Sequence, residues 1–195
     1  NLFKAKIYGS ENVASEMIHL DNPYVQTFMK RNKRGYLRMK EWGKAIFTMM
    51  DVILSQHGVP KELKYLAVIE SSLNPYDRSI PGAVGPWAFM PETAAEYGLK
   101  ITSRYDERTD YAKSTHAAAR MLTDLYAKYK DWLLVIAAYN SGPGWMNKAI
   151  RKHGSNDFWT IQYSLPLETR NHVKKFIAAH YIFEGEGGLT TVTRA

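Results

Sequence analysis

The sequence contains no cysteine, which excludes disulfide bonds, thiolate metal sites and a cysteine nucleophile. It also lacks any apolar run close to the roughly 18 residues that a membrane-spanning helix needs. The histidines form no pair on one helical turn with an acid between them, and no glycine-rich phosphate loop with a lysine occurs. We therefore expect neither a metal nor another cofactor.

What is present describes a globular chain of one-domain size. Its 195 residues are 45% hydrophobic and 13% aromatic, which is enough for a substantial core. The net charge of +7 favours polyanionic partners such as nucleic acid, anionic lipid or an acidic cell wall. The basic residues are scattered, however, and the densest run, residues 30–34, has the length of a solvated helix end. We therefore expect no nucleic-acid partner.

Apolar residues recur at helical spacing along most of the chain, which predicts an all-α fold. Glycines, prolines and capping residues set the ends of the expected helices. These helices span residues 36–56, 60–72, 91–98, 106–128, 131–140, 145–152 and 166–183. Residues 73–90 hold three prolines and two glycines, which indicates a structured loop with room for a small β-hairpin near residues 78–90.

Glu70 is the first candidate for a catalytic residue. At 100° per residue it shares a helix face with Leu63 and Leu66, in a segment that is otherwise nearly all apolar. Burial on that face disfavours the charged form of a carboxyl group. A carboxylic acid that keeps its proton near neutrality can protonate a glycosidic oxygen. The alternative is a surface or salt-bridged residue at a helix end.

The loop that follows can approach a substrate closely, because its prolines and glycines fix the backbone. Ser79 lies nine residues after Glu70, where a hydroxyl can bind the carboxyl group or a sugar, although a turn role is the simpler interpretation. Trp87 and Met90 are candidates for binding the sugar, although the simpler role of their apolar group is core packing. Further along, Tyr139 and Asn140 end an alanine-rich helix, from which both can direct hydrogen bonds into a cleft.

Three segments in this order and at these separations resemble the catalytic domain of the lytic murein transglycosylases of the soluble type, which have a lysozyme-like fold. The matching segments are residues 70–75 (ESSLNP), 79–85 (SIPGAVG) and 138–142 (AYNSG). Further segments are typical of one branch of that family: residues 87–91, 97–99, 105–108, 131–134, 157–159 and 165–170. The resemblance covers roughly residues 45–183.

The resemblance implies that Glu70 is the single catalytic acid and base. It also implies that Ser79 supports the intermediate, and that Met90, Tyr139 and Asn140 contact substrate in the cleft. The family cuts the β-1,4 bond between N-acetylmuramic acid and N-acetylglucosamine. The muramic 6-hydroxyl attacks its own anomeric carbon, so the product has a 1,6-anhydro end and no water is consumed.

Ala88 departs from the family pattern, which usually has glutamine at this position. That glutamine resembles a sugar-binding donor and acceptor, so we expect weakened substrate binding and reduced, not abolished, chemistry. Two alternatives remain open at this point. One is a lysozyme-type hydrolase that uses Glu70 and water, and the other is a non-catalytic peptidoglycan-binding module.

The expected organisation is an N-terminal helical extension (residues 1–44), a lysozyme-like catalytic domain (45–184) and a C-terminal tail or linker (185–195). We expect the groove for the glycan strand to lie between the Glu70 helix and the Tyr139 region. The resemblance implies a monomer in the periplasm that binds peptidoglycan glycan strands. It further implies a targeting segment outside this chain, in the form of a lipoprotein anchor to the outer membrane.

Overall fold

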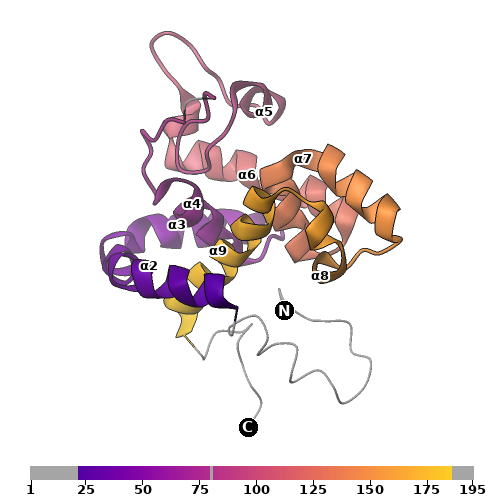
Figure 1. The fold of residues 1–195 in the computed structure, drawn as a ribbon. Coiled ribbons are helices and arrows are strands. Elements are labelled where there is room, and N and C mark those ends of the chain that lie inside the picture. The colour runs from indigo at the N-terminus through magenta and orange to yellow at the C-terminus, as the bar shows by residue number, and fades with distance from the viewer. Residues whose placement is uncertain (1–21, 80, 186–195) are drawn as a thin grey trace. The chain divides into compact units, whose positions relative to one another are not determined.

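The computed structural model describes residues 22–79 and 81–185. Within this part of the chain the regular structure is helical and no strand of a sheet occurs, which confirms the predicted all-α fold (Figure 1). The described residues divide into two compact units, one formed by residues 22–40 and 128–185 and the other by residues 41–127. None of the described helices is long and apolar enough to cross a membrane.

The first unit is built on three α-helices from distant parts of the sequence. These are α2 (Pro23–Trp42), which runs on into the other unit, α7 (Trp132–His153) and α9 (Leu167–Glu184). Helix α7 packs against α9 and against the short α8 (Phe158–Ile161), as Figure 1 shows in orange and yellow. The 3₁₀-helix η3 (Gln162–Ser164) joins α8 to the α9 segment. The sequence did not lead us to expect α8.

The core of this unit explains why α7 and α9 associate. Six consecutive residues of α7, from Leu133 to Ala138, are buried. The alanines in this run have small side chains, so neighbouring helices can approach closely. Helix α9 contributes its own buried side chains, among them Val173, Phe176 and Ile177. Full burial of one such large side chain stabilises a fold by about 1.5–3 kcal/mol.

Two predicted features of α7 are found, one with a correction. The carboxylate of Asp131 accepts a hydrogen bond from the backbone N–H of Leu134 at 2.9 Å and caps the helix, as predicted. The helices predicted at residues 131–140 and 145–152 are instead two halves of one helix, joined by a kink. Gly142 has φ 75° and ψ 164°, and Pro143 follows it. Because a residue before proline avoids helical angles, the backbone bends there without a separate loop.

The second unit contains two α-helices of substantial length, α3 (Lys44–Gln56) and α6 (Tyr111–Tyr129), of which α6 ends beyond the unit's boundary. Between them lie α4 (Tyr65–Ser71), α5 (Pro91–Glu96) and the 3₁₀-helices η1 (Lys61–Lys64) and η2 (Glu107–Thr109). Helix α3 packs against η1, which leads directly into α4. The fold thereby attaches the short Glu70 helix to a longer one.

Several predicted boundaries in this part of the chain were wrong. Gly43 separates α2 from α3 inside the range predicted as one helix, and α2 begins at Pro23 instead of Tyr36. The helix predicted at residues 60–72 begins as the 3₁₀-turn η1. The helix predicted from Asp106 begins at Tyr111, because the Asp106 carboxylate caps η2 through the N–H of Arg108.

The loop between α4 and α5 contains less sheet structure than a hairpin. Isolated antiparallel bridges join Arg78 to Val84 and Val84 to Phe89, without extended strands on either side. The domain boundaries predicted at residues 44 and 184 stay predictions. Residues 1–21 and 186–195, which hold much of the predicted extension and most of the predicted tail, lie outside the described residues.

Candidate active site

Glu70 lies in the last turn of α4, at the edge of the core of the second unit. Leu66 of α4 and Leu63 of the preceding η1 are fully buried, whereas Glu70 is half-buried. The helix is therefore fixed by its apolar side chains while the carboxyl group remains partly accessible. A carboxyl group in this position can exchange a proton with a bound substrate.

The backbone turns sharply directly after Glu70. Ser72 and Leu73 both have left-handed backbone angles, with φ of 55° and 60°. Residues other than glycine rarely adopt this region, and each such residue stores strain of about 1 kcal/mol. Buried contacts hold the turn: Leu73 is 1% exposed, and the Tyr111 hydroxyl donates to its carbonyl at 2.6 Å. The carboxyl group of Glu70 is thus presented at a rigid helix end.

Ser71 connects that helix end to the loop of residues 82–89. Its buried hydroxyl donates to the carbonyl of Pro86 at 2.9 Å. The loop itself closes through two backbone hydrogen bonds between Val84 and Phe89, at 3.0 and 3.1 Å. The residue next to Glu70 is therefore hydrogen-bonded to the middle of the loop, which fixes the loop beside the carboxyl-bearing turn.

Arg108 holds both ends of the same loop. One guanidinium nitrogen, Nη1, donates to the carbonyls of Gly82 at 2.9 Å and Phe89 at 3.0 Å. The Nε and Nη2 atoms donate to the two carboxylate oxygens of Asp106 at 3.0 and 2.8 Å. The hydrogen bond from Arg108 is the largest influence on Asp106 and lowers the pKa of its carboxyl group. We call Asp106 and Arg108 the loop clamp.

The sequence pattern did not predict the loop clamp, because Asp106 has the position of an ordinary helix cap. The available signal was the segment of residues 105–108, which the sequence marks only as typical of one family branch. Next to the clamp, Glu107 accepts hydrogen bonds from Lys113 Nζ at 2.6 Å and from the Lys100 N–H at 2.8 Å. The Lys113 hydrogen bond is the first cause of a lowered pKa of Glu107. Both acids in this segment therefore have structural partners.

Ser79 is exposed and organises its own turn. Its hydroxyl oxygen accepts a hydrogen bond from the Ala83 N–H at 3.0 Å, and its backbone N–H donates to the Ala83 carbonyl at 3.0 Å. This is the turn role that we considered the simpler one. The hydrogen bond from Ala83 does not use the hydroxyl hydrogen, which can still be donated to a ligand.

The predicted residues of the apolar group occupy different environments. Trp87 is fully buried and donates from its indole Nε1 to Thr115 Oγ1 at 3.0 Å, which fits core packing better than a surface for sugar stacking. Met90 is half-buried and precedes α5. Ala88, also half-buried, has a left-handed φ of 51° within the turn that its N–H closes onto the Gly85 carbonyl at 3.0 Å.

Tyr139 and Asn140 belong to the first unit, where they precede the kink in α7. Both are half-buried. The side-chain oxygen of Asn140 accepts a hydrogen bond from the hydroxyl of Thr169 at 2.9 Å, and Thr169 is 1% exposed. Helix α9 thus orients the Asn140 amide with its NH₂ group left to donate. Within residues 22–79 and 81–185, no three acidic or histidine side chains gather as metal ligands.

The family that matches this chain and two of the similar proteins are transglycosylases. Residues 52–162 match the family described as "Transglycosylase SLT domain". The chain is 36% identical over 162 residues to membrane-bound lytic murein transglycosylase D of Escherichia coli K12, a match that covers 77% of this chain and 35% of that protein. It is 30% identical over 118 residues to peptidoglycan transglycosylase gp16 of phage T7, covering 59% of this chain and 9% of that protein. The chain therefore spans about a third or less of these relatives.

Among solved structures, the 70-kDa soluble lytic transglycosylase of Escherichia coli aligns with a TM-score of 0.64 at 24% identity, covering 76% of this chain and 25% of that one. The complex of the 70-kDa soluble lytic transglycosylase with bulgecin A aligns with a TM-score of 0.67 at 20% identity, covering 100% of this chain and 38% of that one. At these identities the alignments establish the fold, and they confirm the predicted lysozyme-like transglycosylase architecture.

Replacement of Gly85 by alanine tests how closely the loop contacts the segment of the clamp. A Cβ atom at Gly85 would lie 2.0 Å from the Arg108 carbonyl oxygen, and Gly85 has φ +87°. We expect Gly85→Ala to lower the free energy of unfolding by more than about 2 kcal/mol in urea denaturation. Gly82→Ala is the matched control, because Gly82 has φ +105° but no atom within 4 Å of the place that a methyl group would take. Equal losses in the two variants would show that backbone strain alone accounts for the effect.

The loop clamp also predicts how stability depends on pH. Because the folded-state pKa of Asp106 is lowered, its stabilisation is present above the unfolded pKa of about 3.9 and is lost as the pH falls through the folded value. We expect Asp106→Asn to cost about 1–2 kcal/mol at pH 7 and progressively less as the pH falls below the unfolded pKa of about 3.9. Thermal unfolding across this range measures the difference. Asp77→Asn is the control, because it removes one carboxylate at an exposed position outside the loop clamp.

Proposed function

The chain belongs to the transglycosylase SLT family, and we propose that it is a peptidoglycan lytic transglycosylase that uses Glu70 as its catalytic acid and base. The observation that carries this proposal is the partly accessible Glu70 carboxyl group at a rigid helix end, inside the matched residues 52–162. The bond to be cleaved is the β-1,4 bond between N-acetylmuramic acid and N-acetylglucosamine. The proposed product has a 1,6-anhydromuramic acid end.

The proposed reaction needs one carboxyl group in two protonation states. Protonated Glu70 first donates its proton to the glycosidic oxygen, and the N-acetylglucosamine leaving group departs. The Glu70 carboxylate then accepts the proton of the muramic 6-hydroxyl as that oxygen bonds to the anomeric carbon. The nucleophile is tethered to the electrophile, so the reaction gains the advantage of proximity and consumes no water.

The environment of the neighbouring acids supports a mechanism with one carboxylate. Hydrolytic glycosidases normally place a second carboxylate opposite the first to activate water or to act as nucleophile. Asp106 is bound to Arg108, and Glu107 to Lys113 and Lys100. These partners hold both acids in structural roles, so neither is available as a second catalytic carboxylate.

We further propose binding roles for the remaining residues of the family pattern. Ser79 would donate its hydroxyl hydrogen to the substrate or the intermediate while its oxygen keeps the turn in place. Asn140 would donate from the NH₂ group that Thr169 leaves available, with Tyr139 beside it in sequence. Met90 and Ala88 would contribute an apolar surface, whereas the buried Trp87 would act by supporting the loop.

We also propose that the substrate is peptidoglycan, that the protein works in the periplasm, and that it works as a monomer.

Substitution of Glu70 tests the proposed chemistry directly. Glu70→Gln cannot donate and accept the proton, and general acid–base catalysis contributes about 10²–10⁴-fold, so we expect turnover of purified sacculi to fall at least about a hundredfold. Mass spectrometry of the parent digest should show anhydromuramic ends. Reducing muramic ends without anhydro products would instead identify a hydrolase. Clearance of cell wall by Glu70→Gln at the parent rate would mean that Glu70 is not the catalyst.

We expect the substitution Ala88→Gln to increase activity. A glutamine there would add a donor and an acceptor to the turn, and one additional hydrogen bond of about 1 kcal/mol corresponds to about a fivefold effect. We therefore expect Ala88→Gln to raise kcat/KM on soluble glycan strands about fivefold, mainly through KM. Ala88→Ser is a smaller polar control that cannot reach as far and should remain near the parent. An unchanged kcat/KM in Ala88→Gln would show that this position does not bind the sugar.

A further inference from the structure

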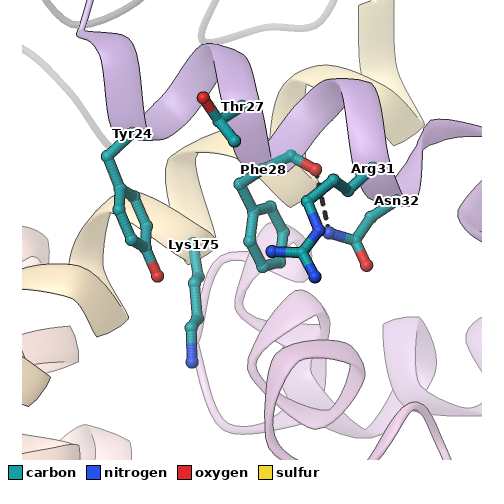
Figure 2. Close-up of a pocket in the computed structure, with 6 residues that line it drawn as sticks. All are labelled: Tyr24, Thr27, Phe28, Arg31, Asn32 and Lys175. Carbon is teal, nitrogen blue, oxygen red and sulfur yellow. Dashed lines mark hydrogen bonds between the residues drawn. The ribbon is translucent and has the colours of Figure 1, made fainter.

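A pocket in the first unit lies outside the residues used in the proposed mechanism. It has a volume of about 330 Å³ and is lined by Tyr24, Thr27, Phe28, Arg31 and Asn32 of α2 and by Lys175 of α9 (Figure 2). The volume is within the range of small-molecule sites. Both helices lie beyond residues 52–162, so the family match does not include this pocket.

The α2 wall of the pocket follows from helical spacing. Tyr24, Phe28 and Arg31 are four and three residues apart and therefore share one helix face, from which Figure 2 shows them projecting. The rings of Tyr24 and Phe28 are nearly parallel, with an interplanar angle of 17° and centroids 6.4 Å apart. Both rings line the pocket and give it apolar surface that can pack against a sugar ring or an aliphatic chain.

Aromatic contacts connect this wall to α9. The Phe28 ring packs against Tyr36 at 6.2 Å, and the Tyr36 ring stacks on Phe183 at 5.5 Å. Burial raises the pKa of the Tyr36 hydroxyl to about 12. The ammonium group of Lys40 donates to the Phe183 carbonyl at 2.6 Å. The two helices that form the pocket are therefore fastened to each other, so the site is preorganised rather than formed by two independent segments.

The charge of the pocket points to an anionic ligand. Arg31 and Lys175 supply two positive charges, and none of the described lining residues is acidic. The Asn32 amide donates to the Phe28 carbonyl at 2.8 Å, as the dashed line in Figure 2 shows, so its side-chain oxygen is oriented by the helix. A guanidinium and an ammonium group that line one pocket suit a carboxylate, which can accept two parallel hydrogen bonds from arginine.

We propose that this pocket is an accessory site for the carboxylate-bearing stem peptide of peptidoglycan, with the Tyr24 and Phe28 rings against the adjoining sugar or aliphatic portion. The identification of the ligand rests on the proposed function, because a glycan strand is the anionic polymer that such an enzyme encounters. Arg31 and Lys175 bind the carboxylate. The site would hold strands that carry peptides without taking part in bond cleavage.

The direct test is titration calorimetry of the parent chain with muramyl dipeptide, which has one sugar ring and one free carboxylate. We expect binding that weakens with added salt and that falls about tenfold or more in Arg31→Gln and in Lys175→Gln, since a hydrogen bond to a charged group contributes about 1.5–3 kcal/mol. Lys33→Gln removes the same charge from an exposed residue that does not line the pocket and should change the Kd less than twofold. The neutral tri-N-acetylchitotriose should not bind here.

Backbone amide shifts in NMR spectra locate the bound dipeptide. Shifts centred on residues 24–32 and 175 support the proposal. Shifts confined to residues 70–90, together with an unchanged Kd in Arg31→Gln, would overturn it. Displacement by inorganic phosphate at equal concentration would also overturn it, because the pocket would then recognise any oxyanion.

Failure of this proposal can be distinguished from failure of the proposed function. Digestion of peptide-free glycan strands to anhydro products depends on Glu70 and does not need the pocket. Anhydro products without dipeptide binding would reject the accessory site alone. Dipeptide binding at residues 24–32 without anhydro products would reject the transglycosylase reaction alone.

Discussion

The double hydrogen bond from Arg108 to the carbonyls of Gly82 and Phe89 is the interaction on which the candidate active site depends. A loop rich in glycine and proline has little regular structure to hold it, so its shape must come from elsewhere in the fold. One buried guanidinium closes it, and Asp106 neutralises the charge that this burial would otherwise leave uncompensated. Ser71 then joins the closed loop to the end of α4. These contacts fix the end of a helix of only seven residues, which carries the Glu70 carboxyl group.

The helical fold could be predicted from apolar spacing because most of the packing is local and periodic. The Asp131 cap and the start of α5 at Pro91 could also be predicted from the sequence, since each depends on residues within one helical turn. The division at Gly43 was not, because a buried glycine inside a continuous apolar pattern does not reveal whether the helix continues. The helix start predicted at Asp106 was wrong for a related reason. In sequence, an acid that caps a helix cannot be distinguished from an acid that binds an arginine two residues later.

In the candidate site, too, the sequence could predict some residues and not others. Glu70 and the segments around it could be identified because their order and separation form a family pattern. The loop clamp could not, since its function depends on contacts of Arg108 with backbone carbonyls 19 and 26 residues earlier. Trp87 shows the converse, because its ring looks suitable for stacking on a sugar yet is fully buried against Thr115. The pocket of Tyr24 and Lys175 joins residues about 150 positions apart, and helical spacing predicts only its α2 wall.

The contact between Gly85 and the Arg108 carbonyl has a consequence for how such enzymes can diversify. Two segments that touch without room for a methyl group cannot change shape independently. A loop of different length or path would need a compensating change near residues 106–108, so the two segments should be inherited as a unit. The sequence would then vary most readily at positions such as the exposed Ser79 and the half-buried Ala88. An exchange of this loop between relatives would therefore need residues 106–108 to be exchanged with it.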